Sequence, residues 1–138
     1  MNKSEEIKDK QGNIIAIIIP KDLKVEGTSF FTPNDFSLQM ALIQRKEGEI
    51  IKAHTHKPIN VTINITQETI FIKKGRVKVD LYDTQKELIE SRTLEAGDVI
   101  LLASGGHGFE ALEELEMVEI KQGPFLSDDY KEIYDSSK

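Results

Sequence analysis

Cysteine is absent from the sequence, and this absence excludes several kinds of chemistry at once. The chain cannot form disulfide bonds, bind a metal through thiolates or use a cysteine nucleophile. Long apolar runs are also missing, since no stretch approaches the roughly 18 apolar residues that a membrane-spanning helix requires. Residues 1–10 lack the apolar segment of a signal peptide. We therefore expect a cytoplasmic protein with no membrane partner.

A concentration of positive charge is missing as well. Lysine and arginine total 18 against 24 aspartate and glutamate residues, which gives a net charge of -6 at pH 7. The basic residues are scattered, whereas a nucleic-acid footprint gathers them on one face. Nucleic acid is therefore not an expected partner. A chain of 138 residues has the size of one ordinary domain, and we expect a single domain over residues 1–138.

The apolar residues follow the periodicity of strands. Residues 76–82 alternate strictly, which places Val77, Val79 and Leu81 on one face of a predicted strand. Residues 127–138 are charged, and a short helix or a frayed tail is expected there. Many short strands at near-regular spacing are typical of an all-β barrel or jelly roll. The further strands that we predict cover residues 13–19, 38–45, 49–54, 68–72, 88–94, 99–102, 108–112 and 117–122.

One predicted strand, Asn13 to Ile19, differs from the others because its apolar run does not alternate. A strand that is apolar on both faces must be covered on both. Its own fold could supply the cover, or a second subunit could. Both alternatives stay open, and the second predicts a homodimer with this segment in the interface.

The histidines carry the strongest functional signal. The chain has three, and His54, His56 and His107 combine with Glu68 into a metal-ligand pattern. Alternate residues of a strand face the same way, so His54 and His56 can act as a pair. Imidazole nitrogens and a carboxylate suit a divalent transition metal, and iron, manganese, nickel and zinc all remain open. We therefore predict one metal site with these four ligands.

The same residues, with the glycines around them, resemble the two motifs of the cupin superfamily. The similarity spans roughly residues 48–122. It implies a cupin-type β-barrel, the double-stranded β-helix or jelly roll, with strands over residues 13–45 before it and a tail over residues 123–138. Residues 57–67 separate the histidine pair from the glutamate and would form a loop or flap beside the barrel mouth. The motif positions are Gly48, His54, His56, Glu68 and Gly75 for the first, and Gly97, Ala103, Gly105 and His107 for the second.

A metal held by three histidines and a glutamate keeps positions open for water or a substrate oxygen. It would polarise a carbonyl, activate water or, as iron, bind dioxygen. All three histidines are used as ligands, which argues against the metal-independent sugar epimerases and ketoisomerases among cupins. Proton transfer would then fall to Glu68, metal-bound water or Tyr82. The candidate substrate contacts are Lys52, Gln122 and Tyr82.

Two functions follow, and the sequence does not choose between them. One is a small metal-dependent enzyme, of isomerase or dioxygenase type, that acts on a polar, oxygen-rich metabolite such as a sugar or carboxylic acid. The other is a non-catalytic metal- or sugar-binding cupin that serves as a sensor or accessory protein. The resemblance to small bacterial cupins that accompany surface-polysaccharide synthesis slightly favours a sugar, although fold does not fix function.

Overall fold

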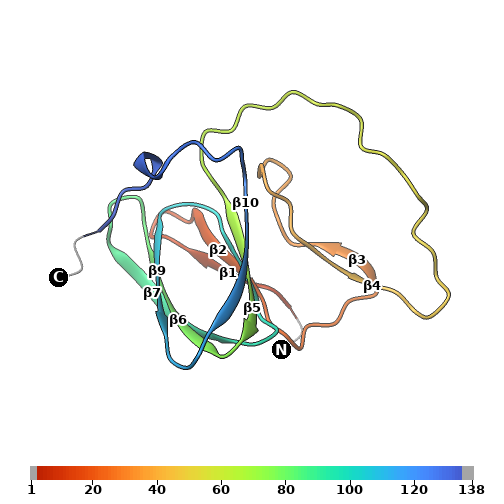
Figure 1. Ribbon diagram of the computed structural model, residues 1–138, viewed down its shortest axis with the longest axis horizontal. Helices are drawn as coiled ribbons and strands as arrows, with labels where there is room; N and C mark the ends of the chain where they lie inside the picture. The colour runs from red at the N-terminus through yellow and green to blue at the C-terminus, as the bar shows by residue number, and fades with distance from the viewer. Residues whose placement is uncertain (1–2, 135–138) are drawn as a thin grey trace.

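The computed structural model describes residues 3–134, and within them the chain is all-β. It has ten strands and one short 3-10 helix, with no α-helix among these residues (Figure 1). No helix in this part of the chain is long and apolar enough to cross a membrane. The elements are β1 (Glu5–Lys8), β2 (Ile14–Ile19), β3 (Gly27–Phe30), β4 (Ala41–Gln44), β5 (Glu68–Lys74), β6 (Arg76–Tyr82), β7 (Leu88–Glu95), β8 (Val99–Leu102), β9 (Gly106–Ala111), β10 (Glu116–Lys121) and η1 (Asp128–Tyr130).

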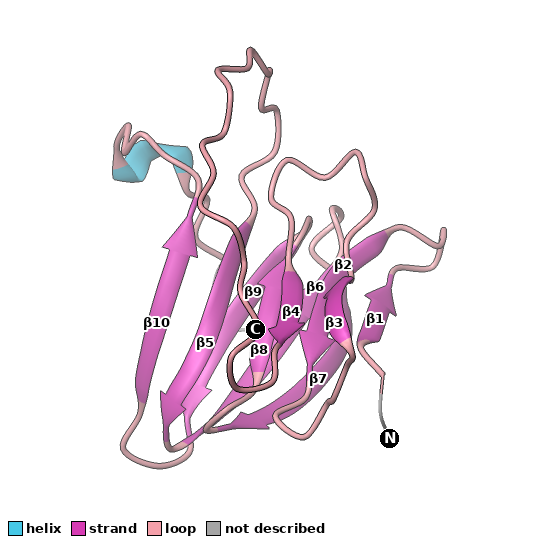
Figure 2. Ribbon diagram, turned by 90° about the vertical axis from the view of Figure 1, so that its right-hand side faces the viewer, coloured by secondary structure: helices cyan, strands magenta, loops and turns pink. Residues whose placement is uncertain are grey.

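The strands form three antiparallel sheets. Five strands lie in the order β1-β2-β8-β5-β10, three lie in the order β7-β6-β9, and β3 pairs with β4 as a separate hairpin (Figure 2). The prediction of an all-β fold is confirmed. Over residues 3–134 every sheet keeps two free edges, and none closes into a barrel.

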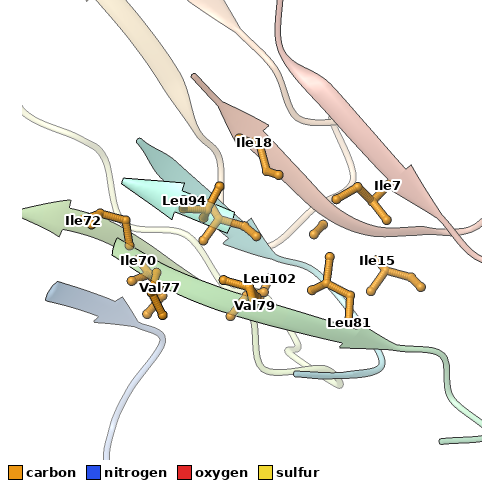
Figure 3. Close-up of a cluster of buried hydrophobic side chains, with 12 residues drawn as sticks. Ile7, Ile15, Ile18, Ile70, Ile72, Val77, Val79, Leu81, Leu94 and Leu102 are labelled. Atoms are coloured by element: carbon orange, nitrogen blue, oxygen red, sulfur yellow. The ribbon is translucent and has the colours of Figure 1, made fainter. Parts of the chain in front are cut away.

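The main core lies between the five-stranded and the three-stranded sheets. The alternation predicted for residues 76–82 is confirmed, because Val77, Val79 and Leu81 are fully buried. They pack in one cluster with Ile70 and Leu102 from the opposite sheet (Figure 3). One apolar row from each sheet therefore holds the two sheets face to face.

The non-alternating run forms β2, which is an internal strand between β1 and β8. Ala16 and Ile18 belong to the main core, whereas Ile17 and Ile19 pack in a second cluster with Met40, beside the β3–β4 hairpin. Of the two alternatives for residues 13–19, the structure shows cover by the chain's own fold. From Ile15 to Ile19 the side chains are buried within the chain itself.

Most predicted strands form, with one clear exception. The strand predicted over residues 49–54 is absent, and residues 45–67 contain no strand at all. Figure 1 shows this stretch as a long excursion from β4 to β5. The strands β1 and β3 were not predicted, because neither has an alternating row of apolar residues. At the C-terminal end a 3-10 helix of three residues forms within the predicted helix or tail, and residues 135–138 of that prediction lie outside the described part.

Two motif glycines are required by the turns that they occupy. Gly75, between β5 and β6, has φ +87°, and a Cβ atom there would lie 2.1 Å from the carbonyl oxygen of Glu114. Gly105, before β9, has φ +71°, and its Cβ would lie 2.1 Å from the carbonyl oxygen of Tyr82. The turns therefore exclude a side chain by backbone conformation and by space together.

Replacing Gly75 with alanine should destabilise the fold more than replacing Gly12, which has the same φ of +87° but no atom within 4 Å of a Cβ. The positive φ alone costs about 1–2 kcal/mol in either variant. The clash in Gly75→Ala should add about 1–3 kcal/mol. Urea denaturation of the two variants measures the difference, and equal destabilisation would contradict the close approach of Glu114.

Candidate functional site

A glutamate and a histidine from opposite sheets meet at one end of the core. The Oε1 atom of Glu68, at the start of β5, lies 2.9 Å from Nε2 of His107 on β9. Strand register explains the contact. Glu68 pairs with Leu102 and His107 pairs with Leu81, and both leucines face the core, so the two polar side chains enter the same space. Glu68 is buried, whereas the side chain of His107 is 32% exposed to solvent.

The contact sets the charge of the glutamate. The hydrogen bond donated by His107 lowers the pKa of the Glu68 carboxyl below its usual value, and this effect exceeds the opposing effect of burial. The positive charge of Lys121, on the core side of β10, lowers the pKa further. Glu68 is therefore a carboxylate at neutral pH, with one oxygen already oriented by an imidazole.

The other two histidines form a separate pair in the stretch without strands. The ring centroids of His54 and His56 lie 5.2 Å apart in an edge arrangement, and both residues are exposed. The Nδ1 atom of His54 lies 2.8 Å from the carbonyl oxygen of Lys52. A carbonyl oxygen only accepts, so Nδ1 carries the proton and Nε2 of the neutral ring keeps a free lone pair.

The four predicted ligands thus appear as two pairs. Among residues 3–134, no three His, Asp or Glu side chains lie close enough to share a metal ion. Glu68 and His107 are held by strands, whose register brings them together. His54 and His56 lie between residues 45 and 67, where no ladder of hydrogen bonds holds the backbone.

The predicted substrate contacts have different positions. Lys52 lies beside His54 in the exposed stretch and accepts its hydrogen bond through the backbone. Tyr82 follows Leu81 in β6 and therefore faces away from His107; its ring packs against Tyr134 at 5.2 Å between centroids. Among the three predicted substrate-binding residues, Tyr82 therefore points to the face of its sheet opposite the Glu68–His107 pair.

Gln122 reaches the site through Gln67, which was not predicted as a site residue. Its Oε1 accepts a hydrogen bond of 3.0 Å from the backbone N–H of Gln67, and its Nε2 donates to Ser37 at 2.6 Å. Gln67 is itself buried, and its side-chain oxygen accepts from the backbone of Leu38. This network fixes the position of the chain immediately before Glu68.

Two charged residues of β10 near the site were also not predicted from the sequence, although the alternation of that strand indicates which of its side chains share a face. Glu119 and Lys121 pair with Ile70 and Glu68, so they lie on the core side of the sheet. The Lys121 Nζ atom lies 3.8 Å from a Glu119 oxygen. Charges at alternate positions beside Met117 indicate a polar margin at this end of the core.

A cavity of about 340 Å³ lies next to this end of β5 without including the glutamate or the histidine. Its lining includes Phe36, Ser37, Ile63, Gln67 and Ser104. The cavity shares Gln67 with the network above, but neither Glu68 nor His107 faces it. It is a separate feature from the contact between the sheets.

Comparison of the chain with protein-family models, with curated proteins and with solved structures finds no match.

In metal-free protein, replacing His107 with alanine should raise the pKa of Glu68, because the hydrogen bond is lost while the burial remains. Carboxyl-resolved NMR titration measures this pKa. His56→Ala is the matched control, since this other histidine lies on the exposed stretch, and it should leave the pKa of Glu68 unchanged.

The same contact gives a pH dependence of stability. A carboxyl whose pKa is lowered by folding contributes stability above the ordinary glutamate range, and this contribution is lost as the pH falls through the lowered value. The difference in unfolding free energy between wild type and His107→Ala should therefore be largest near neutral pH and shrink in acid. A difference that grows in acid would contradict the assigned contact.

Proposed function

We propose that the chain is a metal-binding protein of the cupin type, with a site built on Glu68 and His107 and completed by His54 and His56. The observation that carries the proposal is the 2.9 Å contact between Glu68 and His107. These residues are far apart in sequence and come from different sheets, yet both occupy predicted ligand positions. The pairings of β5 with β8 and of β9 with β6 bring the two side chains into hydrogen-bonding distance.

The donor chemistry fits a divalent transition metal, because such ions accept both the borderline imidazole nitrogen and the harder carboxylate oxygen as ligands. The described arrangement supplies two of these donors at one point, and the histidine pair must approach to complete the set. The stretch that carries the pair has no strand hydrogen bonds to break. When bound, such a metal would act as a Lewis acid toward a substrate oxygen.

The residues around the contact favour a polar ligand. Lys121 offers an ammonium group to a carboxylate or hydroxyl, and Glu119 offers an acceptor beside it. Within the proposal, the substrate is an oxygen-rich metabolite such as a sugar or carboxylic acid, and the reaction is of isomerase or dioxygenase type. The non-catalytic alternative, a sensor or accessory protein of surface-polysaccharide synthesis, uses the same site for binding alone. A cytoplasmic location belongs to both versions.

A second candidate function is proton transfer without a metal. Its specific support is that His107 and Glu68 form a pair independently of the other histidines. The carboxylate orients the imidazole through Nε2, which leaves Nδ1 of the neutral ring as an acceptor for a substrate proton. Such chemistry was not expected from the sequence, because every histidine was predicted to be a metal ligand.

Metal content after purification without added metal separates the two candidates. Wild type should carry close to one transition metal per chain by elemental analysis. His107→Ala and Glu68→Gln should each lower the content at least about tenfold, because they remove a ligand held by the sheets. Glu110→Gln is the matched control, since this carboxylate lies on the same strand as His107 but faces outward toward Lys78.

Wild-type protein without metal, or an unchanged content in Glu68→Gln, would contradict the metal proposal. The proton-transfer candidate would then be tested by deuterium exchange from solvent into candidate sugars. This exchange should persist with a chelator and be lost in His107→Ala.

The fold should survive removal of the metal. The main core contains none of the four ligands, so its burial does not depend on a bound ion. Chelated wild type and His56→Ala should melt at similar temperatures, both below metal-loaded wild type, because a ligand that binds only the folded state stabilises it. Thermal melting followed by circular dichroism measures this, and unfolding by the chelator alone would show that the metal is structural.

A further inference from the structure

Residues 58–67 have the pattern of a strand but have no partner. Apolar and polar residues alternate strictly from Ile59 to Thr66, and the whole segment from Pro58 to Gln67 carries no charge. Such alternation of β-branched and polar residues is typical of a strand with one buried face. The structure leaves this face uncovered: the exposed fractions are 78% for Ile59, 68% for Val61, 44% for Ile63 and 56% for Ile65.

An uncharged segment of this kind is prone to pair with any open sheet edge. The two main sheets offer four edge strands, β1, β10, β7 and β9. Of these, β1 has only four residues. The core-side rows of the two others carry charges, Glu119 and Lys121 on β10, and Glu90 and Arg92 on β7. Pairing the apolar segment there would place its isoleucines against charged groups, which is unfavourable.

The remaining edge, β9, has a row that suits the segment. Its core-side residues are His107, Phe109 and Ala111, and its only hydrogen-bonded neighbour among the described residues is β6. Phe109 faces the core side of the sheet, yet it is 36% exposed to solvent. At Phe109 and Ala111 the margin of the core beside β9 is therefore apolar, incompletely covered and next to a free backbone edge.

The segment and β9 of the same chain lie on opposite sides of the five-stranded sheet. Figures 1 and 2 show the long excursion on the side of the β3–β4 hairpin and the three-stranded sheet on the other side. The second half of the segment lines the cavity with Phe36 and Ser104. Its end is held by the hydrogen bonds of Gln67 and continues directly into β5. In this arrangement the segment lies away from β9 of its own chain.

We propose that residues 58–67 form an additional strand on the free edge of β9 in a second copy of this chain. Reciprocal exchange about a two-fold axis gives a closed dimer in which each copy donates one strand and accepts one. Each donated strand would cover Phe109 and close the open margin of the other copy's core. This proposal does not rest on metal binding, and it assigns the dimer contact to a segment other than residues 13–19.

The proposal is tested by measuring the oligomeric state of wild type and of a variant with one charge introduced into the segment. Light scattering of wild type at micromolar concentration should give twice the chain mass of 15.6 kDa. Val61→Lys should give single chains, because a charge enters the row that β9 covers. The matched control is Ile50→Lys in the same excursion, where the side chain is 82% exposed, and this variant should remain a dimer. A single-chain mass for wild type, or a dimer that survives Val61→Lys, would overturn the proposal.

Cross-linking tests the exchange itself, and the absence of native cysteine makes each introduced thiol unique. Ile63 and Phe109 lie near the middle of their segments, so they approach each other in either strand direction. A mixture of Ile63→Cys chains and Phe109→Cys chains, unfolded and refolded together, should yield a two-chain product with a short bismaleimide. Ile50→Cys mixed with Phe109→Cys should not. An internal link in a chain carrying both cysteines, without a product from the mixture, would show that the segment closes on its own β9 and would overturn the exchange.

Discussion

The face-to-face packing of the five-stranded and three-stranded sheets is the constraint on which the rest of the structure depends. Each sheet contributes one apolar row, and the two rows exclude water from the space between them. Side chains alternate along each strand, so the burial of Val77 and Val79 fixes the directions of all the remaining side chains in β6. Through strand pairing it also fixes those in β9. The direction of His107 follows from that register, and Glu68 obeys the same rule on β5.

The end of this core changes from apolar to polar within one or two residues of each strand. On β5, Ile70 belongs to the core while Glu68 meets His107, and on β10 Met117 is followed on the same face by Glu119 and Lys121. Buried or half-buried charges in such a place need partners, and each of these has one. A polar end on an apolar core favours binding of a polar molecule, whether or not a metal takes part.

The stretch from residue 45 to residue 67 takes part in both the proposed metal site and the proposed dimer. It carries His54 and His56 near its middle and the uncharged alternating segment near its end. Its backbone has no strand partner, whereas its sequence has both two of the predicted metal ligands and the pattern of a strand. A stretch of this length without secondary structure is unusual in a compact domain unless it has a binding role. Both proposals give it such a role.

The sequence by itself determined the all-β class of the fold and most of the strands, and it singled out Glu68 and His107, which the structure brings into contact. Strict alternation in residues 76–82 was sufficient for β6, because a period of two leaves one choice of buried face. The glycines at positions 75 and 105 could also be anticipated from the motifs, since their turns exclude a Cβ atom. Local patterns predicted the structure correctly where a single strand has one buried face.

Only the tertiary structure decided which surfaces are covered and which donor atoms meet. Whether β2 is hidden by its own fold depends on β1, β8 and the β3–β4 hairpin, which are distant in sequence. Residues 58–67 have a clearer strand pattern than β3, yet β3 forms a strand and they do not, because a strand needs a neighbouring edge as well as a suitable sequence. The contact of Glu68 with His107 and the separation of the histidine pair have the same origin. Hydrogen bonds between strands determine positions across the sheet, and no local pattern specifies them.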